Sequence, residues 1–234
     1  MQGALADSQS LAGDVRAPLA YRLAYAVVNA CLSLVFRFEV IGRGNVPAGP
    51  YIVVANHLNW LDAFAILLAL PRDPRLHFVG WDTVARAPRL WWLIRSSRTG
   101  FIAVPRDPDL RSRQRREVQE ALGACLSDGY PAALCPEGSV GQVEGRVSEF
   151  KSGFARLALA TGAPVVPIAL SGTRNLWLGK KVRIAIGAPI RPQGLERKEL
   201  MNRVYLAVVV MLPEYVEPEG RRLLERQLTR LTPR

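Results

Sequence analysis

Apolar and polar positions along this chain predict strands and helices in alternation. After residue 45, short apolar runs rich in valine and isoleucine alternate with longer stretches of helical periodicity. We expect strands at 52–55, 78–79, 100–104, 131–135, 164–170 and 182–186, and helices at 62–70, 80–94, 110–126, 150–161, 195–212 and 221–231. Such alternation indicates an α/β fold with a twisted, largely parallel central sheet flanked by helices.

The N-terminal part of the chain has a different pattern. Residues 1–17 have no basic start followed by an apolar core, so we expect a loose tail rather than a signal peptide. Leu23–Phe36 is an apolar run between two arginines, but it is short for a spanning helix, which needs about 20 residues. We therefore expect residues 18–45 to be a helical, membrane-associating segment at the interface, with an ordinary core-facing helix as the alternative. Residues 46–234 form the remaining domain.

A second segment supports an interfacial location. Arg89–Arg95 also places apolar residues between two arginines, and it contains two adjacent tryptophans. Tryptophan suits a membrane interface because its ring is partly apolar and partly polar.

Charge narrows the classes of partner. The net charge is +11 and most of the basic residues are arginines. This balance favours an anionic partner, which can be a membrane surface, a phosphorylated substrate or nucleic acid. The chain shows no zinc finger, aromatic RNA-binding pattern or obvious recognition helix, so we expect no nucleic-acid partner.

Other chemistries lack their sequence signals. The three cysteines have no metal-ligand spacing, and we expect Cys31 and Cys135 to be buried thiols in a reducing compartment. No phosphate-binding loop, dinucleotide fingerprint or Gly-x-Ser-x-Gly elbow occurs. We therefore expect neither a metal nor a cofactor.

The chain has only two histidines, and His57 comes just after the predicted strand at 52–55. Histidine is the side chain best suited to accept and return a proton at neutral pH. Asp62 lies five residues further on, and on an ideal helix the two would be offset by about 140°. With His57 in a loop and Asp62 in the first helical turn, the ring can turn back so that Asp62 accepts the Nδ1 proton and Nε2 stays free. The alternative is a loop histidine beside a helix-start aspartate that is favoured by the helix dipole.

Four short segments occur in a set order at the predicted strands. They are Asn56–Asp62, Gly100–Asp107, Leu134–Ser139 and Val165–Leu170, with Phe150–Gly153 between the last two. Together they resemble the motifs of the glycerolipid acyltransferase family typified by 1-acylglycerol-3-phosphate acyltransferase. Each segment alone is a weak signal, but four in this order across residues 50–190 are a strong one.

The resemblance implies a membrane-associated enzyme, with 46–234 as its acyltransferase domain, that moves a fatty acyl group from a thioester to a glycerolipid hydroxyl. In the family the first motif's histidine and aspartate are catalytic, and here they fall on His57 and Asp62. The chemistry agrees, because a lipid hydroxyl is a poor nucleophile until a base takes its proton. We expect direct attack on acyl-CoA or acyl carrier protein, with backbone N–H groups at the helix start as donors to the oxyanion.

The same resemblance assigns contacts to the acceptor. Arg106 in the second motif contacts the acceptor's phosphate, a role that suits a guanidinium. Glu137, Gly138 and Ser139 in the third motif hold the glycerol backbone, and Lys151 is a further candidate for contact with an anion. The alternatives are ordinary surface cations at Arg106 and Lys151 and a plain loop carboxylate at Glu137.

Two positions depart from the family pattern. Val140 stands where the third motif usually has an arginine, so a phosphate contact is missing or is supplied elsewhere, with Arg146 and Lys151 as substitutes. Asn59 stands where the first motif often has a serine. The predicted acceptor is lysophosphatidic acid, which gives phosphatidic acid; another lysophospholipid or hydroxylated lipid stays open.

The charge also fits a protein of another class, a non-catalytic basic protein that binds membranes or nucleic acid. The pair of His57 and Asp62 and the loop 136–139 favour an enzyme, because charge-driven binding needs neither. His77 has no acid at a useful spacing, so we expect it to be structural. The expected partners are an anionic membrane surface, acyl-CoA or acyl carrier protein, and a lysophospholipid. The expected location is the cytoplasmic face of the cell membrane, with peripheral or monotopic attachment.

Overall fold

The computed structural model describes residues 19–81, 100–104 and 111–230. The expected tail at 1–17, the tryptophan-containing segment Arg89–Arg95 and Arg106 lie outside the described residues.

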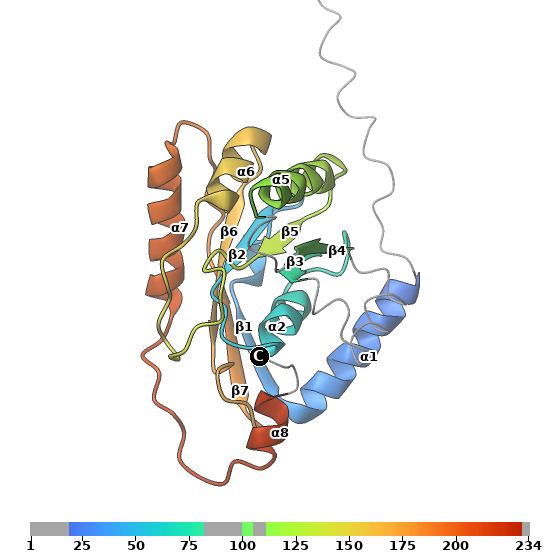
Figure 1. The fold of residues 1–234 in the computed structure, drawn as a ribbon. Coiled ribbons are helices and arrows are strands. Elements are labelled where there is room, and N and C mark those ends of the chain that lie inside the picture. The colour runs from blue at the N-terminus through green and yellow to red at the C-terminus, as the bar shows by residue number, and fades with distance from the viewer. Residues whose placement is uncertain (1–18, 82–99, 105–110, 231–234) are drawn as a thin grey trace, which may run out of the picture.

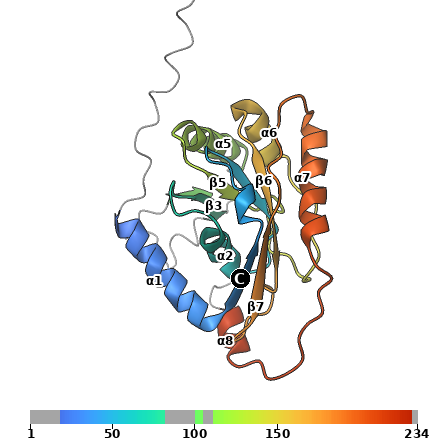
Figure 2. The same cartoon turned by 180° about the vertical axis from the view of Figure 1, so that it is seen from behind.

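A seven-stranded sheet forms the centre of the described part (Figures 1 and 2), in the order β1-β7-β6-β2-β5-β3-β4. Strands β2 to β6 run parallel to one another, whereas β7 is antiparallel to β6 and parallel to β1. The prediction of a largely parallel sheet is therefore confirmed. The strands are β1 (Arg37–Ile41), β2 (Ile52–Ala55), β3 (His77–Trp81), β4 (Gly100–Val104), β5 (Ala132–Leu134), β6 (Val165–Ser171) and β7 (Lys181–Ile186).

Helices cover both faces of this sheet (Figures 1 and 2). Helices α1, α2 and α8 lie on one side, and α5, α6 and α7 lie on the other. They are α1 (Leu19–Val35), α2 (Leu61–Ala69), α5 (Arg111–Ser127), α6 (Gly153–Thr161), α7 (Arg197–Met211) and α8 (Glu225–Thr229), with a short 3-10 turn at Arg43–Asn45.

Strand β2 shows why a continuous apolar run is needed at the centre. All of its residues are buried, because it has strands on both sides and helices on both faces. Val53 and Ala55 join the core beneath α1 and α2, whereas Ile52 and Val54 join the core beneath α5 to α7. A half-buried strand would instead alternate apolar and polar residues.

The N-terminal segment differs from the prediction beyond residue 36. Residues 37–41 were expected to belong to a helical segment, but they form edge strand β1, which pairs in parallel with β7. Glu39 on β1 forms ion pairs with Lys181 and Arg183 on β7, at 2.9 and 3.6 Å. The sheet therefore begins before the expected boundary at residue 45.

Helix α1 is apolar on two sides. Tyr21 is buried and Tyr25 packs against the core, while Leu23, Val27 and Leu34 are exposed. Cys31 is exposed on this helix as well, so the prediction of a buried thiol there is wrong. No helix in the described part of the chain is long and apolar enough to cross a membrane.

The parallel strands bring the loops that carry the candidate site residues to one edge of the sheet. The loops that follow β2 and β5 leave from the carboxyl ends of neighbouring parallel strands, and β6 ends beside them. Ligands of such sheets bind beyond these ends. His77, at the start of β3, lies at the opposite edge, where its ring packs against Tyr130 at 4.9 Å between centroids.

A buried asparagine fixes this edge. The Asn56 side chain donates to the carbonyl of Leu170 at 3.0 Å and accepts from its N–H at 2.8 Å. It thereby continues the β2–β6 pairing one residue beyond β2, because the amide completes the hydrogen bonds that a further backbone pair would have made.

We predict that Asn56→Ala lowers the free energy of unfolding by about 2–4 kcal/mol, since it leaves a buried N–H and carbonyl without partners. Asn45→Ala is the matched control, because Asn45 makes a single side-chain bond, to the Ile186 carbonyl at 2.8 Å, at a half-buried site. Denaturant unfolding followed by circular dichroism measures both. Equal losses in the two variants would contradict a larger contribution of Asn56 to stability.

Candidate active site

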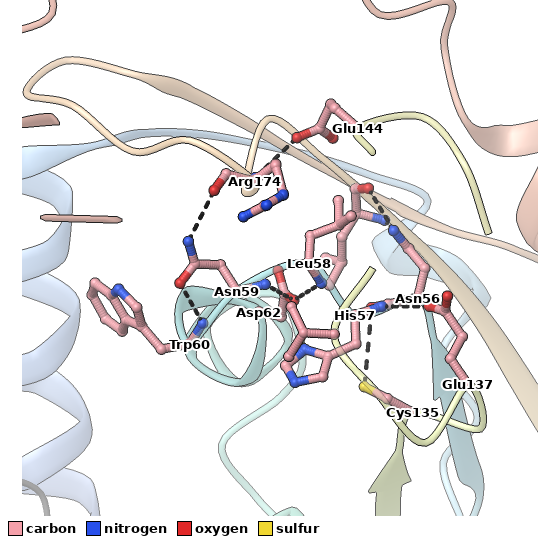
Figure 3. A network of polar contacts seen from close by, with 12 residues as sticks. Asn56, His57, Leu58, Asn59, Trp60, Asp62, Cys135, Glu137, Glu144 and Arg174 are labelled. Atoms are coloured by element: carbon pink, nitrogen blue, oxygen red, sulfur yellow. Dashed lines mark hydrogen bonds and ion pairs between the residues drawn. The ribbon is translucent and has the colours of Figure 1, made fainter. Parts of the chain in front are cut away.

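The site is built around His57 and Asp62, which the fold brings together as predicted. His57 lies in the loop after β2, and Asp62 is the second residue of α2. Their Nδ1 and Oδ2 atoms are 2.8 Å apart, and the side chain of His57 is 32% exposed while that of Asp62 is 1% exposed. A carboxylate only accepts hydrogen bonds, so Nδ1 carries the proton and Nε2 is left with its lone pair. The pair is thus a buried acid behind a partly exposed ring. Figure 3 shows the two residues with the loop that joins them.

Asp62 also organises the loop itself. Its Oδ2 atom accepts the backbone N–H groups of Leu58 at 2.5 Å and Asn59 at 2.8 Å in addition to the imidazole. The N–H of Trp60 donates to the Asn59 side chain at 2.7 Å. The N–H groups at the start of α2 are therefore already engaged, so the expectation that these groups bind an oxyanion does not hold for residues 58–60.

Glu137 lies on the other side of His57 and is buried, with 5% of its surface exposed. Its Oε1 atom accepts the backbone N–H of His57 and its Oε2 atom accepts that of Ser148, both at 2.8 Å. A carboxylate shared by two backbone N–H groups ties the loop after β5 to the loop after β2. The contact with His57 is visible in Figure 3.

The same two loops meet at a second point. The N–H of Gly141 donates to the His57 carbonyl at 2.7 Å. A Cβ atom on Gly141 would lie 3.1 Å from the Leu58 side chain and 3.2 Å from the His57 carbonyl, so glycine permits this close approach. The backbone of His57 is consequently held on both its N–H and its carbonyl side.

Gly138 and Lys151 lie together, as the third motif and its neighbour suggest. Gly138 has φ +72°, and a Cβ atom there would lie 2.1 Å from Lys151 Nζ. The N–H of Lys151 donates to the Pro136 carbonyl at 3.0 Å. The ammonium of Lys151 therefore lies over the glycine of the turn that carries Glu137, on an exposed side chain that can meet an anion.

The remaining candidates are surface residues of this region. Ser139, Val140 and Arg146 are all exposed. Ser139 and Val140 lie between Gly138 and Gly141, and Arg146 lies on the segment between Gly141 and Ser148 that wraps the site. The structure places all three on the segment that follows β5.

The environment of His57 favours its protonated form. Burial opposes protonation of the ring, but the hydrogen bond to Asp62 and the negative charges of Asp62 and Glu137 outweigh it, so the pKa of His57 is raised above 6.5. The opposite holds at His77, where burial and the charge of Arg75 lower the pKa. His57 therefore adds to stability in full below pH 6.5, and this contribution is lost as the pH rises through its folded-state pKa.

Two residues of the site escaped the sequence analysis. Glu144 accepts the N–H groups of Gly172 and Arg174 just beyond β6, both at 2.9 Å. Arg174 in turn donates its Nε to the Gln142 carbonyl at 3.1 Å, and its own carbonyl accepts from the Asn59 side chain at 3.0 Å. These contacts extend the network across the ends of three strands (Figure 3). Only the acidic and basic residue types signal them in the sequence.

A separate hollow of about 360 Å³ opens between β7 and residues 213–218. Lys180 is buried in its wall, bonded to the Tyr215 hydroxyl and 3.5 Å from the centre of the Trp177 ring. Burial lowers the pKa of Lys180 to about 8. His57 does not line this hollow. Among the described residues, no three histidines, cysteines, aspartates or glutamates are placed to hold a metal ion.

Comparison with known proteins identifies the family. An acyltransferase family model matches residues 37–171, more than half of the chain. The chain therefore belongs to the acyltransferase family, in agreement with the motifs of the sequence and the mostly parallel α/β sheet.

Individual relatives share this assignment. A 1-acyl-sn-glycerol-3-phosphate acyltransferase of Cocos nucifera is 25% identical over 71% of this chain and 55% of its own length. A lyso-ornithine lipid O-acyltransferase of Pseudomonas aeruginosa is 28% identical over 87% of this chain and 83% of its own length. The crystal structure of PlsC from Thermotoga maritima, a 1-acyl-sn-glycerophosphate acyltransferase, superposes with a TM-score of 0.65 at 26% identity, covering 82% of this chain and 78% of that one. The chain spans between about a third and just over half of the length of the first three curated relatives.

Titration of the two histidines tests the electrostatics. We predict that nuclear magnetic resonance resolves a pKa above 6.5 for His57 and below 6.5 for His77. Asp62→Asn lowers the pKa of His57, because burial remains while the charge of Asp62 is lost, and it leaves His77 unchanged. Titration of His57 at or below 6.5 in the wild type would contradict this account of the site.

Proposed function

We propose that this protein transfers a fatty acyl group from acyl-CoA or acyl carrier protein to the free hydroxyl of lysophosphatidic acid, giving phosphatidic acid. The observation that carries the proposal is the 2.8 Å contact between His57 Nδ1 and Asp62 Oδ2 at the carboxyl edge of the sheet. Membership of the acyltransferase family and relatives that act on lysophosphatidate support it.

In the proposed mechanism His57 is the general base. Nε2 takes the proton of the lipid hydroxyl as its oxygen attacks the thioester carbonyl, so that a C–O bond forms without a covalent enzyme intermediate. Asp62 stabilises the imidazolium and keeps the ring in one orientation. The C–S bond then breaks, and the proton on Nε2 passes to the leaving thiolate. No cofactor takes part.

The acceptor is proposed to lie along the third motif. Glu137 already holds two backbone N–H groups, so its main contribution is to fix His57 and the loop, with spare lone pairs for a glycerol hydroxyl. Lys151 over Gly138 supplies a cation beside that loop for the phosphate. Ser139, Arg146 and Arg106 complete the proposed set of acceptor contacts.

A second acceptor has support from two observations. Val140 replaces the arginine that usually follows in the third motif, which removes one phosphate contact. The relative from Pseudomonas aeruginosa, a lyso-ornithine lipid O-acyltransferase, covers 87% of this chain. The alternative is therefore the same chemistry on another hydroxylated lipid, such as one that carries ornithine in place of phosphate.

An acceptor panel tests both the reaction and the base. We predict that the purified protein consumes acyl thioester with lysophosphatidate, and that His57→Gln lowers kcat roughly a hundred- to ten-thousand-fold through loss of the base. His77→Gln is the matched control and retains activity. The wild-type kcat/KM falls on acidification below the raised pKa of His57, because only the neutral ring accepts a proton.

The panel separates the outcomes. Acylation of lyso-ornithine lipid while lysophosphatidate is ignored would establish the alternative acceptor. Unchanged turnover in His57→Gln would remove the assigned base. A wild type that turns over no thioester with any lipid would favour the class of non-catalytic basic binding proteins.

We further propose that α1 attaches the protein peripherally to an anionic membrane surface at the cytoplasmic face. A helix that exposes apolar side chains on the face away from the core is typical of attachment to a membrane surface. The inner side of α1 packs on the core, but Leu23 is 59% exposed, Val27 58% and Leu34 83%. The net charge of +11 adds attraction to anionic headgroups.

Vesicle binding tests this attachment. We predict that the double variant Leu23→Ser, Val27→Ser binds vesicles of phosphatidylcholine and phosphatidylglycerol about tenfold more weakly, a loss of about 1.4 kcal/mol of apolar burial. Leu206→Ser on α7 is the control, because Leu206 is equally exposed at 57% but lies on the other side of the sheet. Equal vesicle binding by the double variant and the wild type in co-sedimentation would refute attachment through α1.

A further inference from the structure

The C-terminal end of the described chain contacts the loop that carries His57. Trp60 donates its indole Nε1 to the Leu228 carbonyl at 2.8 Å. Asn59 points its amide nitrogen at the Arg174 carbonyl at 3.0 Å and the Thr229 carbonyl at 3.4 Å. Asn59 and Trp60 lie between His57 and Asp62 in the sequence, so α8 touches the middle of the proposed catalytic loop.

Thr229 holds α8 against the segment that follows β6. Its hydroxyl accepts the N–H of Leu176 at 2.9 Å and donates to the Leu176 carbonyl at 3.3 Å. Leu228 packs against the core cluster beneath α2. The position of α8 is thus fixed by bonds both to the segment after β6 and to the loop before α2.

The opposite side of this C-terminal region is apolar and open. Leu223 is 58% exposed and Leu224 53%, beside Leu178 at 44%. The N–H of Leu178 donates to the Leu223 carbonyl at 3.0 Å, and that of the next residue, Gly179, donates to the Val35 carbonyl at the end of α1 at 2.7 Å. Both views show α8 beside this end of α1 (Figures 1 and 2). The exposed leucines therefore lie near the C-terminal end of α1, which itself exposes Leu34, and grouped apolar exposure of this kind marks a contact surface.

Exposed charges beside these leucines indicate the partner. Residues 219–230 contain four arginines and two glutamates, and Arg221, Arg226 and Arg230 are exposed. Exposed leucines among arginines fit a bilayer with anionic headgroups, where the apolar side chains enter the interface and the guanidinium groups reach phosphate.

We propose that residues 221–229 form a C-terminal strap that contacts an anionic bilayer with its outer side and holds the Asn56–Asp62 loop with its inner side. Asn59, Trp60 and Thr229 are positioning residues, which keep His57 in place through the loop. Contact with lipid then steadies the loop that does the chemistry. The role of that loop rests on the proposed function; the contact with lipid does not.

The outer side is tested without catalysis. Leu223→Ser keeps the backbone bond to Leu178 and removes only the apolar side chain. We expect about tenfold weaker co-sedimentation with vesicles of phosphatidylcholine and phosphatidylglycerol. Leu206→Ser, at 57% exposure, is the matched control and binds as the wild type does. Undiminished binding by Leu223→Ser overturns the outer contact.

The inner side is tested with Trp60→Phe and Thr229→Val, which remove hydrogen bonds and keep the shape. Thr161→Val is the control: Thr161 at the end of α6 also donates one hydroxyl bond, to the Leu157 carbonyl, and accepts one, from the Ala163 N–H. We expect kcat on a water-soluble short-chain acceptor to fall roughly ten- to a hundredfold in the first two variants, with KM little changed, because a small misplacement of the base slows the chemical step. A wild-type kcat in both variants overturns the inner contact.

Hydrogen–deuterium exchange of the full chain tests whether lipid contact on the outer side of the strap affects the loop on its inner side. This measurement does not depend on enzymatic activity. Vesicles should slow exchange in residues 57–62 of the wild type and of Thr161→Val, but not in Thr229→Val, although the last still binds vesicles. Binding without any change in exchange at residues 57–62 overturns the coupling. A wild type inactive on every acceptor while these exchange results hold would instead refute the proposed function and leave the strap standing.

Discussion

One oxygen atom determines the shape of the candidate site. Oδ2 of Asp62 accepts the imidazole of His57 and the backbone N–H groups of Leu58 and Asn59, all within 2.8 Å. These three donors come from consecutive residues, so the chain must curl around the carboxylate before α2 can begin. The curl turns the ring back toward Asp62, which the spacing of five residues would not allow on a regular helix. Because Asp62 is buried, its carboxylate needs these donors: an unpaired buried charge is costly.

Carboxylates perform the same task elsewhere around the site. Glu137 binds the N–H groups of His57 and Ser148, and Glu144 binds those of Gly172 and Arg174. All four N–H groups lie in loops beyond the strands, where no neighbouring strand supplies a carbonyl, so acidic side chains serve as the acceptors. The negative charge of Glu137, together with that of Asp62, also helps to raise the pKa of His57. The same carboxylate, Glu137, thus holds the loops together and raises the proton affinity of His57.

Features formed by residues close together in the sequence could mostly be predicted. The buried run of β2 was evident from its uninterrupted apolar residues, and the proximity of His57 and Asp62 followed from a strand, a loop and a helix start. Strand β1 was missed because its alternation of Arg37, Phe38 and Glu39 is short and sits directly after an apolar helix. As an edge strand it is half exposed, and among the described strands it pairs only with β7, more than a hundred residues away.

Contacts between distant segments could not be predicted in the same way. The bonds from Glu144 to the residues after β6, and from Trp60 to Leu228, join segments 28 to 168 residues apart. Neither has a spacing rule, because the sheet order, not the sequence, makes them neighbours. The proposed roles of Arg106 and Ser139 come from the family resemblance, whereas Arg146 was named as a substitute for the arginine that Val140 replaces.

The two anchors of the His57 backbone have a consequence for how such an enzyme can change its substrate. Glu137 holds the N–H of His57 and Gly141 holds its carbonyl, which leaves Ser139 and Val140 as an exposed bridge between two fixed points. Substitutions on this bridge alter the exposed side chains beside the site while the histidine stays where it is. Side chains on the bridge can therefore change without moving His57, and the valine at position 140 is compatible with an intact pair of His57 and Asp62.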